Sequence, residues 1–274
     1  CLAAIHKAIS QVAAAGGGTV VFPPAKQPYL VSGTVVIRSS NVKLSGKGAT
    51  IKLADGAANG TKAKRTTDSQ VHVLWVAGEP DKPVQRIEIR GLTIDANIYR
   101  QEDYYNPRAI VVEHGHLVKI RDVTILRPFV GLDIGAGSSD CEVRGCVIED
   151  WLEDGFDASG DADKGSGAIT TNIRFIDCHA RGAPKSTGNA WEIEDGVRHV
   201  RVIDCSVTDV PKGNAFGIRN HWKAGPVDIS RDIQLRGVRI ERVGGKYGIY
   251  SHCAPREKFP RNRVADIGLY DVHC

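Results

Sequence analysis

The sequence predicts an all-β solenoid of stacked coils, with a short helix over its N-terminal end. One four-residue phrase begins at positions 109, 131, 155, 190, 215 and 248, and consists of a small residue, an apolar one, a variable one and a second apolar one. A looser copy spans residues 73–76, and a second strand-like phrase lies inside each later interval. Short strands repeated with little helix between them exclude a βαβ fold. They favour coils whose equivalent strands stack into parallel sheets.

The composition is that of a globular protein. Of the 274 residues, 42% are hydrophobic and 25% are charged, which excludes a disordered chain. No apolar run approaches the roughly 20 residues that a membrane span needs, so we expect no span. The formal net charge of +4 is compatible with an anionic partner. We expect neither a nucleic-acid partner nor an organic cofactor.

The first predicted element is a capping helix over residues 1–16. Four apolar residues lie on one face of it at helical spacing: Leu2, Ile5, Ile9 and Val12. Gly16 can end the helix, which would cover the open end of the coil stack and its exposed strand edges. About seven or more coils then follow from residue 17 onward, so we predict a single domain over residues 1–274.

The second phrases alternate with period two, as expected for short strands with one buried face. They span residues 118–123, 141–146, 173–178, 200–205 and 233–238. Cys146, Cys178 and Cys205 share one position in this repeat. No paired cysteine spacing accompanies them, so we predict an inward stack of thiols in the core rather than a metal site.

The intervals between copies of the first phrase are uneven, which indicates inserted loops. The insertions lie near residues 161–169, 181–188 and 222–230. Loops inserted on a solenoid usually line its binding face, so we expect a ligand near these segments.

The third position of the first phrase should face outward, because its neighbours on either side are apolar. This position places Asp133, Asp157 and Glu192 one above another on successive coils, with a solvent-facing carboxylate on each. Two positions further on, Glu194, Arg219 and His252 should form a parallel row. Stacked like charges destabilise a sheet unless a cation, a shared proton or an arginine compensates them. We therefore interpret the ladder as a functional site, with an ordinary solvated surface as the alternative.

Aromatic side chains flank this ladder and suit sugar binding. Trp75 and Tyr250 occupy the outward position at either end of it, and Tyr104 and Tyr105 lie in an aromatic loop. Each could stack on a sugar ring, whereas Phe156, Trp191 and Phe216 occupy core positions.

Four segments resemble the pectate-lyase superfamily of carbohydrate-active proteins: Gly16–Pro24, Tyr29–Ser32, Val42–Ala49 and Gly91–Asn97. The resemblance covers nearly the whole chain and implies a right-handed, single-stranded parallel β-helix with an N-terminal capping helix. It also favours a secreted, periplasmic or cell-surface protein. The superfamily includes polysaccharide lyases, glycoside hydrolases, epimerases, phage tailspikes and non-catalytic members, so the fold does not choose the activity.

The first hypothesis is a lyase that cleaves an acidic, uronic-acid polysaccharide by β-elimination. The pair Glu192-x-Glu194 with Arg219 on the next coil is similar to the chondroitinase-B-like alginate lyases, although Arg198 and His199 replace their catalytic lysine. The predicted catalytic residues are Asp157, Glu192, Arg219, His221 and His252. The predicted ligands of a Ca²⁺ ion are Asp133, Asp157, Glu192 and Glu194. The predicted substrate-binding residues are Trp75, Tyr104, Tyr105, Asp133, Lys223 and Tyr250.

Three alternatives stay open. Paired carboxylates on adjacent coils would suit a glycoside hydrolase, and Glu153–Asp157 faintly resembles the polygalacturonase motif, although its Gly-His-Gly is missing. A C5-epimerase would use the same proton abstraction as a lyase. A non-catalytic glycan-binding or tailspike-like module would need aromatic and charged groups but no convergent acid and base.

The C-terminal segment Ile267–Cys274 reads as a strand with no polar cap after it. We expect either that the chain is trimmed here or that a partner covers this lower end of the stack, so that an oligomer is possible there.

Overall fold

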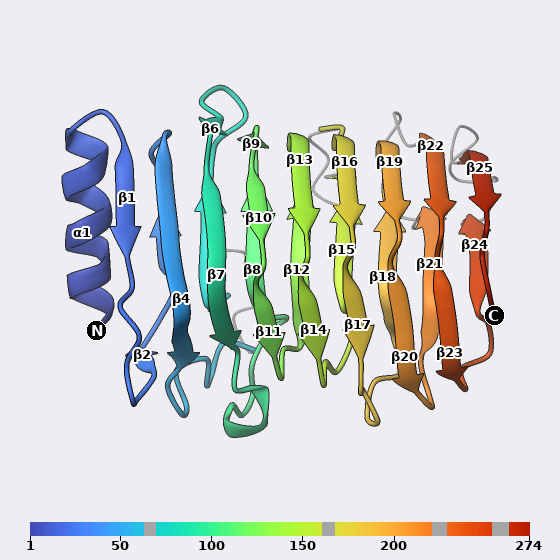
Figure 1. The fold of residues 1–274 in the computed structure, drawn as a ribbon, viewed down its shortest axis with the longest axis horizontal. Helices are drawn as coiled ribbons and strands as arrows, with labels where there is room; N and C mark the ends of the chain where they lie inside the picture. The colour runs from blue at the N-terminus through green and yellow to red at the C-terminus, as the bar shows by residue number, and fades with distance from the viewer. Residues whose placement is uncertain (63–69, 161–167, 221–228, 254–262) are drawn as a thin grey trace.

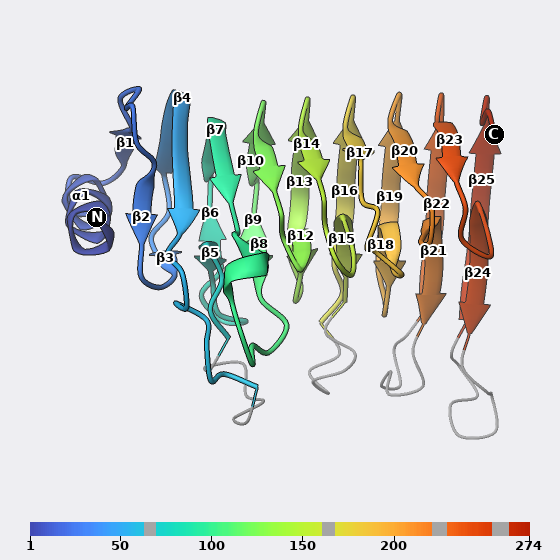
Figure 2. The same ribbon diagram turned by 90° about the horizontal axis from the view of Figure 1, so that it is seen from below.

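The computed structural model describes residues 1–62, 70–160, 168–220, 229–253 and 263–274. The chain folds as a right-handed parallel β-helix whose coils follow one another in a single row from the N-terminus to the C-terminus (Figure 1). The same row is seen in the view turned by 90°, with the helix at one end and β24 and β25 at the other (Figure 2). The predicted fold class is therefore confirmed.

Helix α1 (Leu2–Ala14) covers the first coil, as predicted. Ile5 and Ile9 are buried, and Leu2 and Val12 pack partly buried against the same core. The helix contacts β1, β3 and β4, and it ends just before Gly16, whose φ of 85° is readily adopted only by glycine.

The repeated phrase forms one continuous eight-stranded parallel sheet, here named sheet B. Its strands, in stacking order, are β3 (Val35–Ile37), β5 (Leu74–Ala77), β8 (Arg108–Glu113), β12 (Val130–Gly135), β15 (Phe156–Ser159), β18 (Asn189–Glu194), β21 (Asn214–Asn220) and β24 (Ile249–Cys253). Each copy of the phrase falls on one strand. Equivalent residues pair from coil to coil, as Leu132 with Phe156 and Phe156 with Trp191.

The second phrases lie in the 17-stranded sheet A, which forms the other side of the coils. Its strands are β1 (Gly18–Val21), β2 (Tyr29–Val31), β4 (Val42–Leu53), β6 (Val84–Gln85), β7 (Glu88–Asp95), β9 (Gly115–His116), β10 (Lys119–Arg121), β11 (Thr124–Leu126), β13 (Ser139–Arg144), β14 (Val147–Glu149), β16 (Thr171–Ile176), β17 (His179–Arg181), β19 (Arg198–Ile203), β20 (Ser206–Val210), β22 (Ile229–Arg236), β23 (Arg239–Val243) and β25 (Arg263–Tyr270). One further element is the 3-10 helix η2 (Ile98–Arg100).

Most coils bend once within sheet A, at a residue with positive φ. Asp or Gly occupies the bend between consecutive strands of a coil, as at Asp122 between β10 and β11 and at Asp177 between β16 and β17. Short polar side chains and glycine tolerate this left-handed conformation, which explains why the strand phrases all end in Asp or Gly before their last apolar residue.

The core lies between the two sheets and is filled by stacked side chains. The rings of Phe156, Trp191 and Phe216 stack on successive coils, with centroids 4.6 Å and 5.1 Å apart. Cys146, Cys178 and Cys205 are also fully buried and stacked as free thiols, as predicted. Large side chains at equivalent positions thus pack along the axis of the helix and hold the coils in register.

The last described coil ends in β24 and β25. Strand β25 spans Arg263–Tyr270, so the strand expected over residues 267–274 begins and ends earlier than predicted. Leu269 and Tyr270 on it are half-exposed. The oligomer expected at this end stays a prediction. Among the described residues, no helix has the length and apolar character of a membrane span.

Candidate functional site

The carboxylate ladder predicted from the sequence is present on sheet B. Asp133 on β12 pairs with Asp157 on β15, which pairs with Glu192 on β18. Contrary to expectation, none of the three is solvent-facing, since they are only 3%, 5% and 1% exposed. The alternative of an ordinary solvated surface therefore does not describe these residues. Carboxylates buried this deeply need compensating protons or cations.

Arg108 balances the charge of Asp133, at the end of the ladder nearer the N-terminus. Its Nε donates to Oδ2 of Asp133 over 2.5 Å, and the Ser159 hydroxyl donates to Oδ1 of Asp133 over 2.9 Å. Burial lowers the pKa of Arg108, but the attraction of Asp133 and Asp157 outweighs it, so the pKa is raised overall. Arg108 lies just before the first full copy of the repeated phrase. The sequence pattern assigns outward-facing positions only within the phrase and after it, so it did not identify Arg108.

Asp157, in the middle of the ladder, is compensated differently. Its Oδ1 is buried and makes no hydrogen bond with any described residue. Burial raises the pKa of Asp157 well above its ordinary value, and the charges of Asp133 and Glu194 raise it further. Both effects favour the neutral carboxylic acid over the carboxylate at this position.

Arg219 balances the charge of Glu192, at the end of the ladder nearer the C-terminus. Its Nε directly contacts the Glu192 carboxylate and lies 3.3 Å from Oε2 of Glu194. Burial raises the pKa of Glu192, and Asp154 and Glu194 add to this effect, while Arg219 opposes it. The row Glu194, Arg219 and His252 also forms as predicted, in register across β18, β21 and β24.

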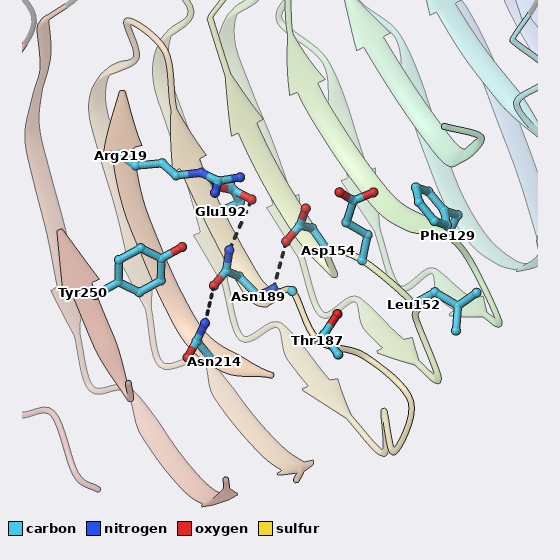
Figure 3. A pocket seen from close by; sticks show the side chains of 11 residues that line it. Phe129, Leu152, Asp154, Thr187, Asn189, Glu192, Asn214, Arg219 and Tyr250 are labelled. Carbon is cyan, nitrogen blue, oxygen red and sulfur yellow. Dashed lines mark hydrogen bonds and ion pairs between the residues drawn. The ribbon is translucent and has the colours of Figure 1, made fainter. Parts of the chain in front are cut away.

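A cavity of about 410 Å³ opens beside Glu192 and Arg219. It lies along β18, β21 and β24 and the turns that precede β12, β15 and β18 (Figure 3). Its lining consists of Phe129, Leu152, Glu153, Asp154, Thr187, Gly188, Asn189, Glu192, Asn214, Arg219 and Tyr250. Three of these were predicted as site residues, namely Glu192, Arg219 and Tyr250. Thr187 and Gly188 come from the inserted loop at 181–188, which therefore does line the cavity.

Asp154 is among the residues of this cavity that sequence reasoning missed as site residues, together with Glu153 and Asn189. It lies in the turn before β15 and is 7% exposed. Its Oδ1 accepts the backbone N–H of Asn189 over 2.8 Å, and its carboxyl group interacts electrostatically with that of Glu192 on the next coil. Burial raises the pKa of Asp154 to about 6, with a contribution from Glu153. Burial and the neighbouring carboxylates also raise the pKa of Glu192, so both acids bind a proton more tightly than exposed carboxyl groups do.

A chain of neutral groups continues from this pair. The Asn189 side chain donates to Oε2 of Glu192 over 3.2 Å, and Asn214 donates to the Asn189 side-chain oxygen over 3.2 Å. The Tyr250 hydroxyl and the Asn189 amide both lie over Gly217, and burial raises the pKa of the phenol. The amides and the phenol therefore present fixed neutral hydrogen-bonding groups around the acid pair (Figure 3).

The other predicted site residues lie away from this cavity. Trp75 on β5 is covered by the Arg38 guanidinium, 5.1 Å from its ring centroid. Asp133 and Asp157 stay on the ladder above the cavity, and His252 is exposed on β24 without lining it. Tyr105 does not reach the cavity either.

Tyr104 contributes indirectly, because its ring packs edge-on against Phe129, with centroids 5.4 Å apart. His221 and Lys223 lie outside the described residues.

The ladder does not fit the predicted Ca²⁺ site. No group of three or more Asp, Glu, His or Cys side chains in the described part of the chain is arranged to hold a metal ion. The guanidinium groups of Arg108 and Arg219 occupy the carboxylates of Asp133 and Glu192, which a calcium ion would need as ligands. The expectation of calcium stays a prediction, and no chemical step below depends on it.

The signal for Asp154 was present but weak. It begins the segment Asp154-Gly155-Phe156-Asp157, directly before a buried strand. Nothing in the local sequence shows that the next coil brings Asn189 and Glu192 against it. That contact arises only from the stacking of β15 on β18.

No protein-family model and no curated protein sequence matches the chain. Several solved structures share its fold. The endo-xylogalacturonan hydrolase of Aspergillus tubingensis is 15% identical, with a TM-score of 0.64 over 99% of this chain and 80% of the hydrolase. A hyperthermoactive exopolygalacturonase of Thermotoga maritima is 14% identical, with a TM-score of 0.56 over 99% and 82%.

The N-terminal fragment of gene product 12 of bacteriophage phi29 is 16% identical, with a TM-score of 0.62 over 99% of this chain. The chain spans only 54% of the length of that fragment. At these identities the likeness concerns the fold, which carbohydrate-active enzymes and phage proteins share.

Proposed function

We propose that this right-handed parallel β-helix, whose fold is that of the pectate-lyase superfamily, is a glycoside hydrolase that cleaves a polysaccharide at the cavity on sheet B. The observation that carries the proposal is the buried carboxyl group of Asp154, which lines the cavity together with Glu192 and has a pKa raised to about 6. A carbohydrate-active role agrees with the two polysaccharide-degrading enzymes among the similar structures.

Hydrolysis of a glycosidic bond needs a carboxylic acid that protonates the leaving oxygen and a second carboxylate that activates water or attacks the sugar. Asp154 is the acid, because its pKa of about 6 leaves it substantially protonated under mildly acidic conditions. Glu153 is the second carboxylate, since it lines the same cavity and is exposed to water. Asp154 gives its proton to the departing sugar, and Glu153 takes a proton from the attacking water.

Glu192 and Asn189 act as positioning residues in this proposal. The Asn189 backbone N–H fixes one Asp154 oxygen, and Glu192 contacts the Asp154 carboxyl group from the next coil. Arg219 holds Glu192 in place through a direct ion pair. The acid is thus oriented by groups that belong to rigid strands rather than to loops.

The geometry favours hydrolysis over the β-elimination that was the first hypothesis. Elimination and epimerisation both remove the proton next to a uronate carboxylate, and a cation must neutralise that carboxylate. Arg219 is the cation among the described residues that line the cavity, and it is already paired with Glu192 and Glu194. A uronate would have to compete with both of these carboxylates.

The two reactions give different products, which supplies the test. The protein is incubated with xylan, galactan, arabinan, mixed-linkage glucan, polygalacturonate and alginate, and new reducing ends and unsaturated uronides are measured in parallel. We expect reducing ends without unsaturated product from at least one polymer. An ultraviolet-absorbing unsaturated uronide would instead establish a lyase, and the absence of any cleavage across the panel would contradict the hydrolase.

A further inference from the structure

Carboxylic acids outnumber cations in the described lining of the cavity. Among the described residues that line it, three are carboxylic acids, Glu153, Asp154 and Glu192, and one is a cation, Arg219. The guanidinium is shared between Glu192 and Glu194, the latter lying just behind it. The positive charge of Arg219 is therefore already balanced by carboxylates of the protein and is not available to an incoming anion.

The pKa values of these groups also reflect the negative charge around them. Burial lowers the pKa of Arg219, yet the charges of Glu192 and Glu194 more than reverse this, and its pKa is raised. Burial and neighbouring carboxylates together raise the pKa of Asp154 and of Glu192. A further carboxylate placed among them would meet repulsion in a partly desolvated space, where charges interact more strongly than in water.

Among the described residues, one cluster of positive charge lies away from the cavity. On the outer face of sheet A, Arg121, Arg144 and Arg174 gather around Glu142, with nitrogens 2.8–3.6 Å from its oxygens. The described residues that line the cavity do not share the positive sign of the net charge of +4, which suggested an anionic polymer.

The uncharged part of the lining suits the hydroxyl groups and the apolar faces of a neutral sugar. Asn189, Asn214 and Tyr250 present amide and phenol groups on one side of the acid pair (Figure 3). Phe129 and Leu152 form an apolar wall on the other side, and Tyr104 supports Phe129 from behind. Few convergent polar groups beside an apolar wall are typical of carbohydrate and small-molecule pockets.

We infer that the sugar residue bound in this cavity carries no carboxylate, so that the substrate at the cleavage site is a neutral hexose, pentose or N-acetylated sugar rather than a uronic acid. The inference rests on the proposed function for the site but concerns the class of substrate. It replaces the acidic polymer expected from the sequence with a neutral one.

The test separates binding from cleavage. The D154N variant is applied to immobilised neutral polysaccharides, namely xylan, galactan, arabinan, mixed-linkage glucan and galactomannan, and to immobilised polygalacturonate, alginate and hyaluronan. We expect retention on at least one neutral polymer, at least about tenfold tighter than on any uronate polymer at the same ionic strength. N214A and Y250F in the same background should weaken that retention, which places it in the cavity.

Tighter retention on a uronate polymer would overturn the inference, and so would no retention on either group. The matched variant E153Q, also combined with D154N, should reduce the difference in retention between neutral and uronate polymers, because it removes one of the charges that repel a uronate. The experiments can refute the substrate class and the proposed hydrolase activity separately. Neutral binding without cleavage by the wild-type protein refutes the hydrolase alone, and hydrolysis confined to uronates refutes this inference alone.

Discussion

The carboxyl group of Asp154, in the turn before β15, accepts the backbone N–H of Asn189 at the start of β18 over 2.8 Å. The two residues are far apart in sequence but lie on adjacent coils, because Asp157 pairs with Glu192 in sheet B. Their contact places Asp154 near Glu192, which Arg219 holds through an ion pair. The predictions below follow from this arrangement.

The first prediction concerns the pH dependence of stability. Because the pKa of Asp154 is about 6 in the folded protein, above its ordinary 3.8, the folded state binds this proton more tightly than the unfolded state does. The resulting stabilisation is fully present below about pH 4 and is lost as the pH rises through about 6. In D154N this contribution is absent, because an amide does not titrate in this range.

Urea unfolding at several pH values checks this prediction. Wild type should lose up to about 3 kcal/mol relative to D154N between about pH 4 and pH 7. A constant difference in unfolding free energy over that range would show that Asp154 titrates normally.

The second prediction concerns Arg219. In R219A the Glu192 carboxylate stays buried without its cation, so we expect a loss of about 3–5 kcal/mol in the free energy of unfolding. The double variant R219A/E192Q should recover part of this loss, because the buried charge is removed as well. R239A serves as a control, since Arg239 is exposed and its variant should change stability by less than about 0.5 kcal/mol. Equal losses in R219A and R239A would contradict the account.

The third prediction compares two positions of the ladder. Burial and the neighbouring charges favour the neutral form of Asp157, so D157N should cost less than about 1 kcal/mol. Asp133 is ion-paired with the buried Arg108, and D133N should cost about 2–4 kcal/mol because the guanidinium loses its charged partner. Thermal or urea unfolding of the two variants at neutral pH decides the order. The reverse order would mean that the charge of the ladder resides on Asp157.

The fourth prediction concerns calcium. Because Arg108 and Arg219 occupy the carboxylates of Asp133 and Glu192, we expect no change in the melting temperature on addition of millimolar Ca²⁺ or of a chelator. Differential scanning fluorimetry measures this directly. A calcium-dependent rise that is lost in E192Q would restore the site predicted from the sequence.

Much of the fold was predictable because it depends on short-range patterns. The repeated phrase placed Asp133, Asp157 and Glu192 on one ladder, and the period of two placed the three cysteines in the core. The amphipathic spacing of Leu2, Ile5, Ile9 and Val12 gave the capping helix. In a solenoid each coil repeats the preceding one, so a local pattern determines long-range neighbours.

The candidate site was less predictable, because it depends on turns and on what covers them. The alternation rule states which way a side chain points, but it does not state how deeply neighbours such as Arg108 bury it. Asp154 lies just before β15 and Asn189 begins β18, and the repeated phrase carries no chemical signal at either place. Their contact follows from the stacking of two coils.

The central claim is that Asp154 donates the proton in glycoside hydrolysis. It is tested most directly by the initial rate of reducing-end release from the polysaccharide that the wild-type protein cleaves fastest. D154N should lose at least about 100-fold in this rate. D81N, which changes an exposed aspartate in the turn between β5 and β6, should stay within about twofold of wild type. A folded D154N variant that releases reducing ends at the rate of D81N would contradict the account.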